Sequence, residues 1–281
     1  MRFEKYFKSS ITSAFQTEIL ETEFAGHAIE LSKRAADSLP DGILAAGGDG
    51  TLNQVINGVL QSGKNIPVGI LPLGTGNDFA AHCGIGSVKN IIELLHGEGM
   101  PTDVGLLRGL SSTGEPILRY FINIASIGLG PDVVHRLENS SRRFGPDLTY
   151  VLETVQAFFK QKPAEINIET PQWKWSGKVR AFAIANGSRF GSGLYVAPEA
   201  RPDDGIFSTF SAGDVPLLSF LYFLLRIRSK QKITHTKARY DVCNSIHLTA
   251  AVPTFIETDG ELACLLPASI ELLPQAIKIF R

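Results

Sequence analysis

Apolar and polar positions divide this chain into two stretches with different periodicities. From Phe24 to about Leu107, helical patterns alternate with short apolar strands, as in a parallel sheet with helices on its faces. We expect helices at residues 27–38, 52–62 and 88–96, and strands at residues 41–46 and 66–71. This stretch is therefore predicted to be an α/β domain.

After Asp103 the pattern changes to apolar strands separated by Gly, Pro, Asn and Ser turns. The expected strands are residues 120–125, 179–186, 206–210, 245–250 and 255–258, and the expected helices are residues 148–159 and 216–228. We predict a mostly antiparallel β domain over residues 108–273. It follows an α/β domain over residues 1–107, to which a last strand at about 274–281 can return.

Composition narrows the class of protein. The formal net charge is −1, so no global field of positive charge points to nucleic acid as a partner. The cysteines Cys83, Cys243 and Cys264 are odd in number and widely spaced, a pattern that fits a reducing cytoplasm. The longest apolar run, residues 215–225, is shorter than the roughly 20 residues that span a bilayer.

Two glycine turns carry the strongest functional signal. Residues 47–51 read Gly-Gly-Asp-Gly-Thr and residues 73–78 read Leu-Gly-Thr-Gly-Asn-Asp, each between a predicted strand and a predicted helix. Turns of this kind direct backbone N–H groups at an anion. The carboxylate of Asp49 would repel a phosphate, so its presence favours Mg-nucleotide chemistry. An ordinary turn with Asp49 as a cap is the alternative.

Together these loops resemble the diacylglycerol kinase catalytic domain family, which includes bacterial diacylglycerol kinases, sphingosine kinases and ceramide kinases. The first loop is shared with NAD kinases, whereas residues 71–80, Leu-Pro-Leu-Gly-Thr-Gly-Asn-Asp-Phe-Ala, are similar to the lipid kinase version. Further motifs follow in the family's order at residues 120–123, 186–187, 191–198, 203–205 and 259–261. The resemblance implies an NAD kinase/diacylglycerol kinase-like nucleotide-binding domain followed by the β-rich domain.

By this resemblance, the nucleotide contacts are assigned to residues of the two loops and to one threonine before them. They are Thr22, Gly48, Asp49, Gly50, Thr51, Leu52, Asn53, Gln54 and Thr75. Gln54 departs from the family, which commonly has Glu at this position. A negative charge near the nucleotide is therefore missing.

The resemblance also implies a magnesium site in the turn at residues 203–205. Its expected ligands are the carboxylate of Asp204 and the main-chain carbonyl groups of Arg201 and Ile206. A β-turn chosen for its geometry alone is the alternative.

The general base is predicted at one of two carboxylates. Similar kinases use a glutamate in the Asp-Gly-Glu segment, which here is Glu261, whereas sphingosine kinases place the base in the glycine-rich loop, which here offers Asp49. The choice between them is left open. Without the resemblance, residues 258–261 would be read as a hairpin turn.

The family pattern is incomplete at the start of this sequence. Members usually open with a strand and an Asn-Pro-x-x-Gly loop, which this sequence lacks. We expect the first strand to be missing and the parallel sheet to have a gap there.

Two weaker signals concern membranes. Residues 216–225 are apolar and are followed by Arg226, Arg228, Lys230 and Lys232. A packed core helix with a solvated basic end is the favoured interpretation, and contact with an anionic membrane is the alternative. Trp173 and Trp175 are expected to be strand residues, with an interfacial anchor as the less favoured reading.

The sequence predicts an ATP- and Mg²⁺-dependent kinase that phosphorylates a lipid hydroxyl, with diacylglycerol as the expected lipid. The alternatives are an NAD kinase and a catalytically silent nucleotide- or lipid-binding relative. The expected partner is a lipid at the membrane surface, without nucleic acid or a transmembrane segment, and homodimer formation is left open. We expect a cytoplasmic protein, peripheral on the inner face of the membrane at most.

Overall fold

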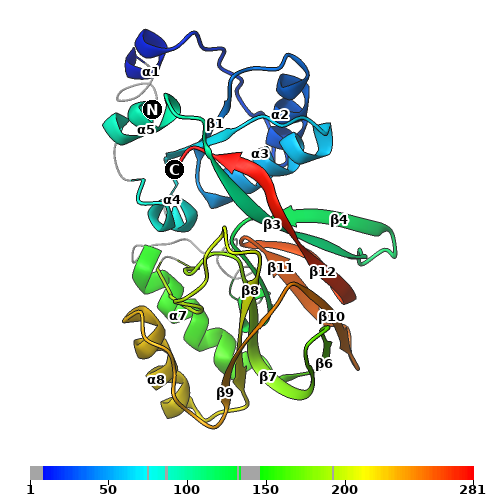
Figure 1. Ribbon diagram of the computed structural model, residues 1–281. Helices are drawn as coiled ribbons and strands as arrows, with labels where there is room; N and C mark the ends of the chain where they lie inside the picture. The colour runs from blue at the N-terminus through cyan, green and yellow to red at the C-terminus, as the bar shows by residue number, and fades with distance from the viewer. Residues whose placement is uncertain (1–8, 75, 86–87, 132, 134–145, 192) are drawn as a thin grey trace. The chain divides into compact units, whose positions relative to one another are not determined.

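The computed structural model describes residues 9–74, 76–85, 88–131, 133, 146–191 and 193–281 (Figure 1). The chain forms two compact units, the first made of Met1–Thr102 with Gln275–Arg281 and the second of Asp103–Pro274. Among the described residues, no helix is long and apolar enough to cross a membrane.

Helices surround a short run of parallel strands in the first unit. Strand β1 (Ile43–Gly47) pairs in parallel with β2 (Val68–Pro72), and Ile279 in β12 (Glu261–Ile279) pairs in parallel with Val68. The helices are α1 (Ser9–Ala14), α2 (His27–Asp37), α3 (Asp49–Ser62), α4 (Asp78–His82) and α5 (Val88–Leu95). The predicted returning strand is thus the end of β12, while a wider parallel sheet stays a prediction.

Close packing of α2 on α3 depends on Gly58. A Cβ atom at this position would lie 2.0 Å from Ser32 Oγ and 2.3 Å from the carbonyl oxygen of Ile29. The buried apolar side chains of α3 recur at helical spacing, as Leu52, Val55, Ile56 and Val59. The glycine therefore lets two helices approach more closely than any side chain would permit.

The second unit is β-rich, as expected, and its centre is a closed antiparallel barrel. Neighbouring strands follow the order β12-β10-β6-β7-β5-β11, and β11 pairs again with β12. The strands are β5 (Ile124–Gly128), β6 (Ala164–Glu169), β7 (Lys174–Ala185), β10 (Ser245–Ala250), β11 (Phe255–Thr258) and β12. Strands β3 (Met100–Leu110) and β4 (Pro116–Phe121) form a hairpin, and β8 (Phe207–Gly213) and β9 (Ala238–Cys243) continue from β7.

Alternating side chains of the barrel strands build two apolar cores. In β7, Phe182 and Ile184 belong to one core, and Ala183 and Ala185 belong to the other. The second core is completed by α7 (Pro146–Lys160) and α8 (Leu217–Arg228), which lie side by side in Figure 1. Both helices fall where the periodicity predicted them.

The predicted strand at residues 120–125 is wrong in one respect, because it is interrupted. Strand β4 ends at Phe121 and β5 begins at Ile124. The N–H groups of Ile122, Asn123 and Ile124 donate to the carboxylate of Asp259, at 2.8, 3.0 and 3.0 Å. The Asp259 side chain therefore takes the place of a neighbouring strand as hydrogen-bond acceptor for these N–H groups. The local sequence does not predict this contact, because Asp259 is distant along the chain.

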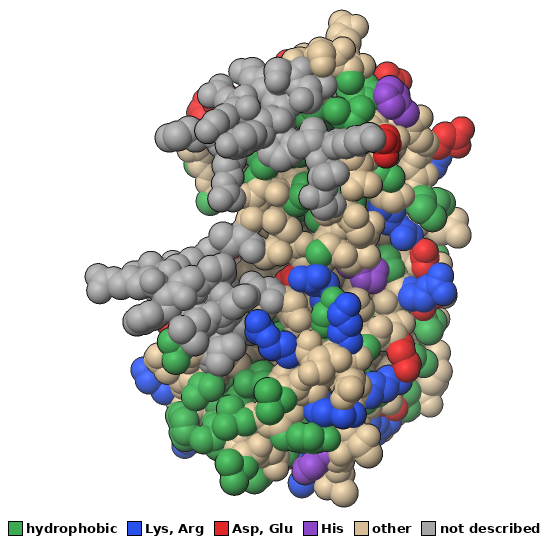
Figure 2. All heavy atoms as spheres, turned by 90° about the vertical axis from the view of Figure 1, so that its left-hand side faces the viewer, with side chains coloured by type: hydrophobic (Ala, Val, Ile, Leu, Met, Phe, Trp, Pro, Cys, Tyr) green, Lys and Arg blue, Asp and Glu red, His purple; other side chains and the backbone are tan. Residues whose placement is uncertain are grey.

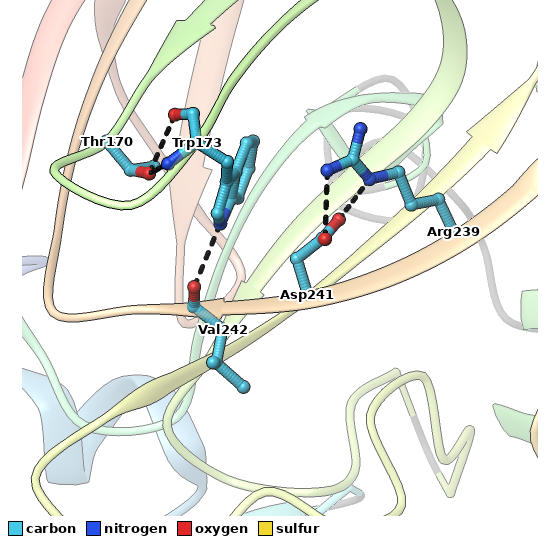
Figure 3. Close-up of polar contacts among 5 residues, drawn as sticks. All are labelled: Thr170, Trp173, Arg239, Asp241 and Val242. Carbon is cyan, nitrogen blue, oxygen red and sulfur yellow. Dashed lines mark hydrogen bonds and ion pairs between the residues drawn. The ribbon is translucent and has the colours of Figure 1, made fainter.

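Trp173 is held by polar contacts, as Figure 3 shows. Its indole N–H donates to the carbonyl oxygen of Val242 at 2.9 Å, and its main-chain N–H donates to Thr170 Oγ1 at 2.9 Å. The guanidinium carbon of Arg239 lies 5.1 Å from the centre of a Trp173 ring, and Arg239 is also paired with Asp241. The prediction that Trp173 is a strand residue is wrong, because it lies just before β7 begins. Its contacts with Val242 and Arg239 of β9 give it a structural role.

Candidate active site

The two glycine turns of the first unit are hydrogen-bonded to each other. The N–H groups of Leu73 and Gly74 donate to the carbonyl oxygen of Gly47, at 2.9 and 3.2 Å. Asn77 closes the second turn, since its side chain donates to the carbonyl oxygen of Gly74 at 2.8 Å and accepts from Gly74 N–H at 3.1 Å. The two glycine turns, which the sequence analysis placed after two separate strands, therefore form one hydrogen-bonded unit, here called the cradle.

Asp49 fastens this cradle to the next helix. Its carboxylate oxygens accept hydrogen bonds from the N–H groups of Asp78 and Phe79, both at 3.0 Å. These N–H groups begin α4, so Asp49 satisfies donors that a helix start leaves unpaired. Helix α3 itself starts at Asp49, three residues before the predicted start at residue 52. The carboxylate thus has a structural task in addition to any role toward a nucleotide.

Glycine is required where the two turns touch. A Cβ atom on Gly74 would lie 2.4 Å from Gly48 Cα and 2.9 Å from Asn77 Oδ1. Backbone atoms cannot move aside as the end of a side chain can, so any larger residue must separate the turns.

We expect Gly74→Ala to lower the free energy of unfolding by about 1–3 kcal/mol and to weaken ATP binding at least about tenfold. The physical reason is the loss of the contact between the turns. Urea unfolding and isothermal titration with ATP measure the two effects. Gly97→Ala is the control, because its Cβ would come no closer than 3.2 Å to the oxygen of Leu94. An unchanged ATP affinity in Gly74→Ala would show that the turns can separate without cost.

A cavity of about 780 Å³ runs along β1 in the first unit. Residues 17–22, 40–46, Thr51 and Leu73 are among those that line it. Residues 17–22 form no helix or strand, and they border this cavity. Among the described strands, β1 pairs only with β2, which leaves room on its other side. Of the expected nucleotide contacts, Thr22 and Thr51 are brought to this one space.

The other expected nucleotide residues lie in different surroundings. Leu52 and Asn53 are buried in α3, with the Asn53 carbonyl oxygen accepting from the Asn57 side chain at 2.9 Å. Gly48, Gly50 and Gln54 lie in the turn and the first turns of α3 and are partly exposed. Thr75 lies outside the described residues. Contact of these residues with a nucleotide stays a prediction.

Several carboxylates lie close together around residues 203–205 of the second unit, the turn where magnesium is expected. Asp204 accepts from Ile206 N–H at 3.2 Å, and Arg201 lies 3.5 Å from Asp203 in an ion pair. Burial raises the pKa of Asp204 above its usual value, and the nearby charges of Asp103 and Asp203 raise it further. A cation there would relieve this repulsion. Within the described ranges, no group of at least three Asp, Glu, His or Cys side chains is placed to hold a metal, whereas the predicted set relies mainly on carbonyl groups.

Asp103 is a site residue that the sequence analysis missed. Its buried carboxylate accepts from Gly205 N–H at 2.8 Å, and its own N–H donates to the carbonyl oxygen of Pro202 at 2.7 Å. The residue is about a hundred positions away from this turn in the sequence, so only the fold brings the two together. One signal for this residue was present in the sequence, which is that Asp103 stands where the α/β pattern changes to the β-rich pattern.

The segment around Glu261 is a two-residue hairpin turn between β11 and β12. Asp259 and Gly260 have φ values of 49° and 86°, the left-handed pair that such a turn requires. Asp259 also organises the break between β4 and β5. The hairpin interpretation is therefore correct, and it holds together with a role for Glu261.

Glu261 lies at the start of β12 and forms an ion pair with Arg119 of β4. The side chains are 32% and 21% exposed, respectively, so the carboxylate is fixed in direction and still open to solvent. A positioned, accessible carboxylate is what a general base needs. Asp49, by contrast, uses both oxygens on backbone N–H groups, which favours Glu261 as the base.

Glu257 is a second residue that the sequence analysis missed. It is fully buried in β11, bonded to the Ser126 hydroxyl, and it accepts from Gly260 N–H at 2.9 Å. Burial raises the pKa of Glu257 to about 8. The carboxyl group therefore supports the turn that carries Glu261. The burial of Glu257 was not predictable from the sequence, because an acidic residue in a strand is normally expected to face solvent.

We expect the free energy of unfolding to fall between about pH 4.5 and pH 8, by an amount on the order of 5 kcal/mol, because of Glu257. The folded state keeps its proton across this range and the unfolded state releases it, so rising pH favours unfolding. Urea titrations below, within and above the range measure the slope. Glu257→Gln should flatten it, and Glu169→Gln, at an exposed pair with Lys174, should leave it unchanged. An equal slope in both variants would assign the effect to other groups.

An apolar cavity of about 90 Å³ lies in the second unit beneath α7 and α8. Its lining combines apolar side chains of β7, β8 and α8 with two hydroxyl groups, those of Ser126 and Thr154. Ser126 also binds Glu257, so the cavity ends close to the Asp259 hairpin. Ordinary ligand pockets enclose roughly 300–1,000 Å³, so this small space admits only a short part of an apolar chain.

Unsatisfied polar atoms gather near the same hairpin. Asn123 Oδ1, Asn186 Oδ1 and Thr258 Oγ1 are buried and have no hydrogen-bond partner among the described residues. Their other groups are well bonded: Asn186 Nδ2, for example, donates to the oxygens of Ile122 and Asp103 at 2.7 and 2.9 Å. Buried acceptors of this kind are costly unless a further molecule pairs with them.

Known proteins match this chain over nearly its whole length. Residues 2–107 match the family described as the diacylglycerol kinase catalytic domain, and residues 125–281 match the YegS C-terminal NAD kinase beta sandwich-like domain. A Staphylococcus carnosus diacylglycerol kinase is 26% identical over 270 residues, covering 95% of this chain and 85% of that protein. The Bacillus subtilis diacylglycerol kinase is also 26% identical, with 95% and 86% covered.

A solved structure agrees with the fold. The crystal structure of a diacylglycerol kinase from Bacillus anthracis str. Sterne has a TM-score of 0.75 and 21% identity, covering 99% of this chain and 89% of that one. At this identity the likeness concerns the fold alone. The two domain matches, in contrast, contain both glycine turns and the Glu261 hairpin. The chain therefore belongs to the diacylglycerol kinase family of ATP-dependent lipid kinases.

Proposed function

We propose that this protein transfers the γ-phosphoryl group of ATP to the free hydroxyl group of diacylglycerol, which gives phosphatidate and ADP. The observation that carries the proposal is the interlocked pair of glycine turns fastened by Asp49. These bonds occupy N–H groups of the second turn and of the start of α4, so the proposed donors to phosphate oxygens are the N–H groups at the start of α3. The lipid as acceptor is supported by the match to the diacylglycerol kinase catalytic domain.

The two units divide the work in this proposal. The first unit is an NAD kinase/diacylglycerol kinase-like nucleotide-binding domain whose contacts with ATP come from Thr22, the turn at residues 48–54, and Thr75. The second unit holds the lipid and supplies the base. For the nucleotide, support comes from the cavity that Thr22 and Thr51 share. For the lipid, the small apolar cavity beneath α7 and α8 supports contact with a short part of one chain.

Glu261 acts as the general base in the proposed step. It accepts the proton of the lipid hydroxyl while that oxygen forms a bond to the γ-phosphorus, and the bond from this phosphorus to the bridging oxygen of ADP breaks. Arg119 holds the Glu261 carboxylate in place. Phosphoryl transfer depends mostly on positioning and charge stabilisation, so a single placed base suffices.

Magnesium is proposed at the turn of residues 201–206. The Asp204 carboxylate and the carbonyl groups of Arg201 and Ile206 would hold it, with Asp203 and Asp103 nearby. The hard oxygen donors and the mutual repulsion of these carboxylates fit such a cation. The ion would supply positive charge that stabilises the turn, and Mg²⁺ bound with ATP would neutralise its phosphates.

A lipid kinase assay tests the proposal. The protein is incubated with labelled ATP, Mg²⁺ and separate acceptors, namely diacylglycerol, ceramide, sphingosine and NAD. We expect label in phosphatidate only. Label in NAD alone would make the protein an NAD kinase, and label in no acceptor, with ATP bound, would make it a catalytically silent relative.

A further inference from the structure

We propose that the outer face of α8 docks on an anionic lipid surface. This α8 face consists of Leu218, Leu221, Tyr222 and Leu225. The choice of a lipid surface as partner rests on the proposed function, because a kinase that acts on a membrane lipid has to reach the membrane.

Helix α8 carries apolar residues on two opposite sides. One side, with Phe220, Phe223 and Ile227, is buried, and Phe220 stacks on Phe158 of α7 at 4.6 Å between ring centres. The other side is the α8 face, where Leu218 is 81% exposed and Leu225 is 68% exposed. The buried side already anchors the helix to the unit, so the α8 face is not needed for folding.

The spacing of the α8 face makes it a continuous stripe. Its four residues follow each other at intervals of three, one and three positions, which places them on one side of a helix. Figure 2 shows hydrophobic side chains gathered on the lower surface where α7 and α8 lie, with Lys and Arg side chains on the neighbouring surface. A gathered apolar surface next to basic residues is typical of an interfacial helix.

The charged side chains in α8 and in the sequence just after it are all positive. Residues 215–240 contain no Asp or Glu and six cations, which are Arg226, Arg228, Lys230, Lys232, Lys237 and Arg239. Acids from outside the segment pair with some of these cations, as Glu199 does with Lys232 and Asp241 with Arg239. Positive charge therefore remains in excess, as an anionic surface requires.

The positive charge around the α8 face favours an anionic membrane over a second copy of the chain as its binding partner. A symmetric dimer built on the α8 face would bring the same cations of both copies together, and like charges oppose association. Acidic lipid headgroups complement them. Membrane contact of residues 216–225, which the sequence analysis disfavoured, is thus supported by the exposure of the α8 face.

Co-sedimentation of the whole protein with vesicles, without ATP, tests the proposal. We expect binding to vesicles of phosphatidylcholine with phosphatidylglycerol, and weak binding to phosphatidylcholine alone. Leu218→Ser with Leu225→Ser should weaken binding at least about tenfold. Arg228→Gln and Lys230→Gln should each weaken binding to the acidic vesicles about fivefold, and added salt should weaken this binding as well.

Leu118→Ser on β4 is the matched control, because Leu118 is also exposed, at 50%, and is not part of the α8 face. It should bind as the unchanged protein does, and thermal unfolding should be equal in all variants. No binding to acidic vesicles, equal binding to neutral ones, or binding that the α8 variants leave intact would overturn the proposal. A dimer dissociated by the double variant, without vesicle binding, would also overturn it.

Activity on a dispersed short-chain diacylglycerol separates this proposal from the proposed function. Such a substrate needs no membrane, so the double variant should phosphorylate it at the unchanged rate. Vesicle binding without any kinase activity would reject only the proposed function. Activity on the dispersed lipid without vesicle binding would reject only docking.

Discussion

Glu261→Gln is expected to lower kcat by about 10²- to 10⁴-fold while the melting temperature stays the same. Glutamine retains the shape of the side chain and loses the capacity to accept the hydroxyl proton. The ion pair with Arg119 is partly buried, but the glutamine amide oxygen can still accept a hydrogen bond from Arg119, so we expect little effect on folding. Steady-state kinetics with diacylglycerol, together with a thermal melt, measures both quantities.

The chain offers a matched control for this variant. Glu271 also lies on β12 and is also paired with an arginine, Arg108, at 3.0 Å. Glu271→Gln removes a similar charge and a similar ion pair, and we expect kcat to stay the same. If both variants lose activity equally, the effect belongs to the charge of β12 and Glu261 is not the base.

Asp49→Asn is expected to lower both stability and activity. The asparagine retains one acceptor oxygen and presents an NH₂ group to the second backbone donor, so one of the N–H groups of Asp78 and Phe79 loses its partner. Leaving a buried donor unsatisfied costs about 1–3 kcal/mol. We expect a melting temperature lower by several degrees and weaker ATP binding, which calorimetry and titration measure.

Asp37→Asn is the control for this second variant, because Asp37 is an exposed residue at the end of α2 in the same unit. It should match the unchanged protein in both measurements. The opposite pattern for Asp49, with kcat lost and the melting temperature unchanged, would indicate that Asp49 is the base. In that case Glu261→Gln should retain activity.

Local pattern was sufficient for many elements of the fold. The pattern of residues 52–62 predicted α3, and that of residues 216–228 predicted α8, because a helix repeats its contacts every three to four residues. Pattern failed at Ile122 and Asn123, which look like strand residues. Their N–H groups bind Asp259, more than a hundred residues away, and such a contact has no local signature.

The candidate site was predictable in its parts and not in its arrangement. The glycine turns, Asp204 and Glu261 were named as candidates because a motif constrains residue types at fixed spacing. Asp103 and Glu257 were missed, since an acid at a strand position reads as exposed, and only tertiary packing buries them. Thr22 was named by resemblance, and its place in the cavity that Thr51 also lines depends on the course of residues 17–22.

By itself, the sequence determined the kind of protein: two glycine turns in an α/β stretch, a β-rich stretch after it, and residue types suited to ATP and a lipid hydroxyl. Tertiary structure alone decided what the carboxylates do. Asp49 and Asp259 bind backbone N–H groups of other segments, Glu261 meets Arg119, and Glu257 is buried and holds its proton more tightly. The reason is that residue type limits which bonds a side chain can make, whereas its partners and its solvent exposure arise only when distant segments pack together.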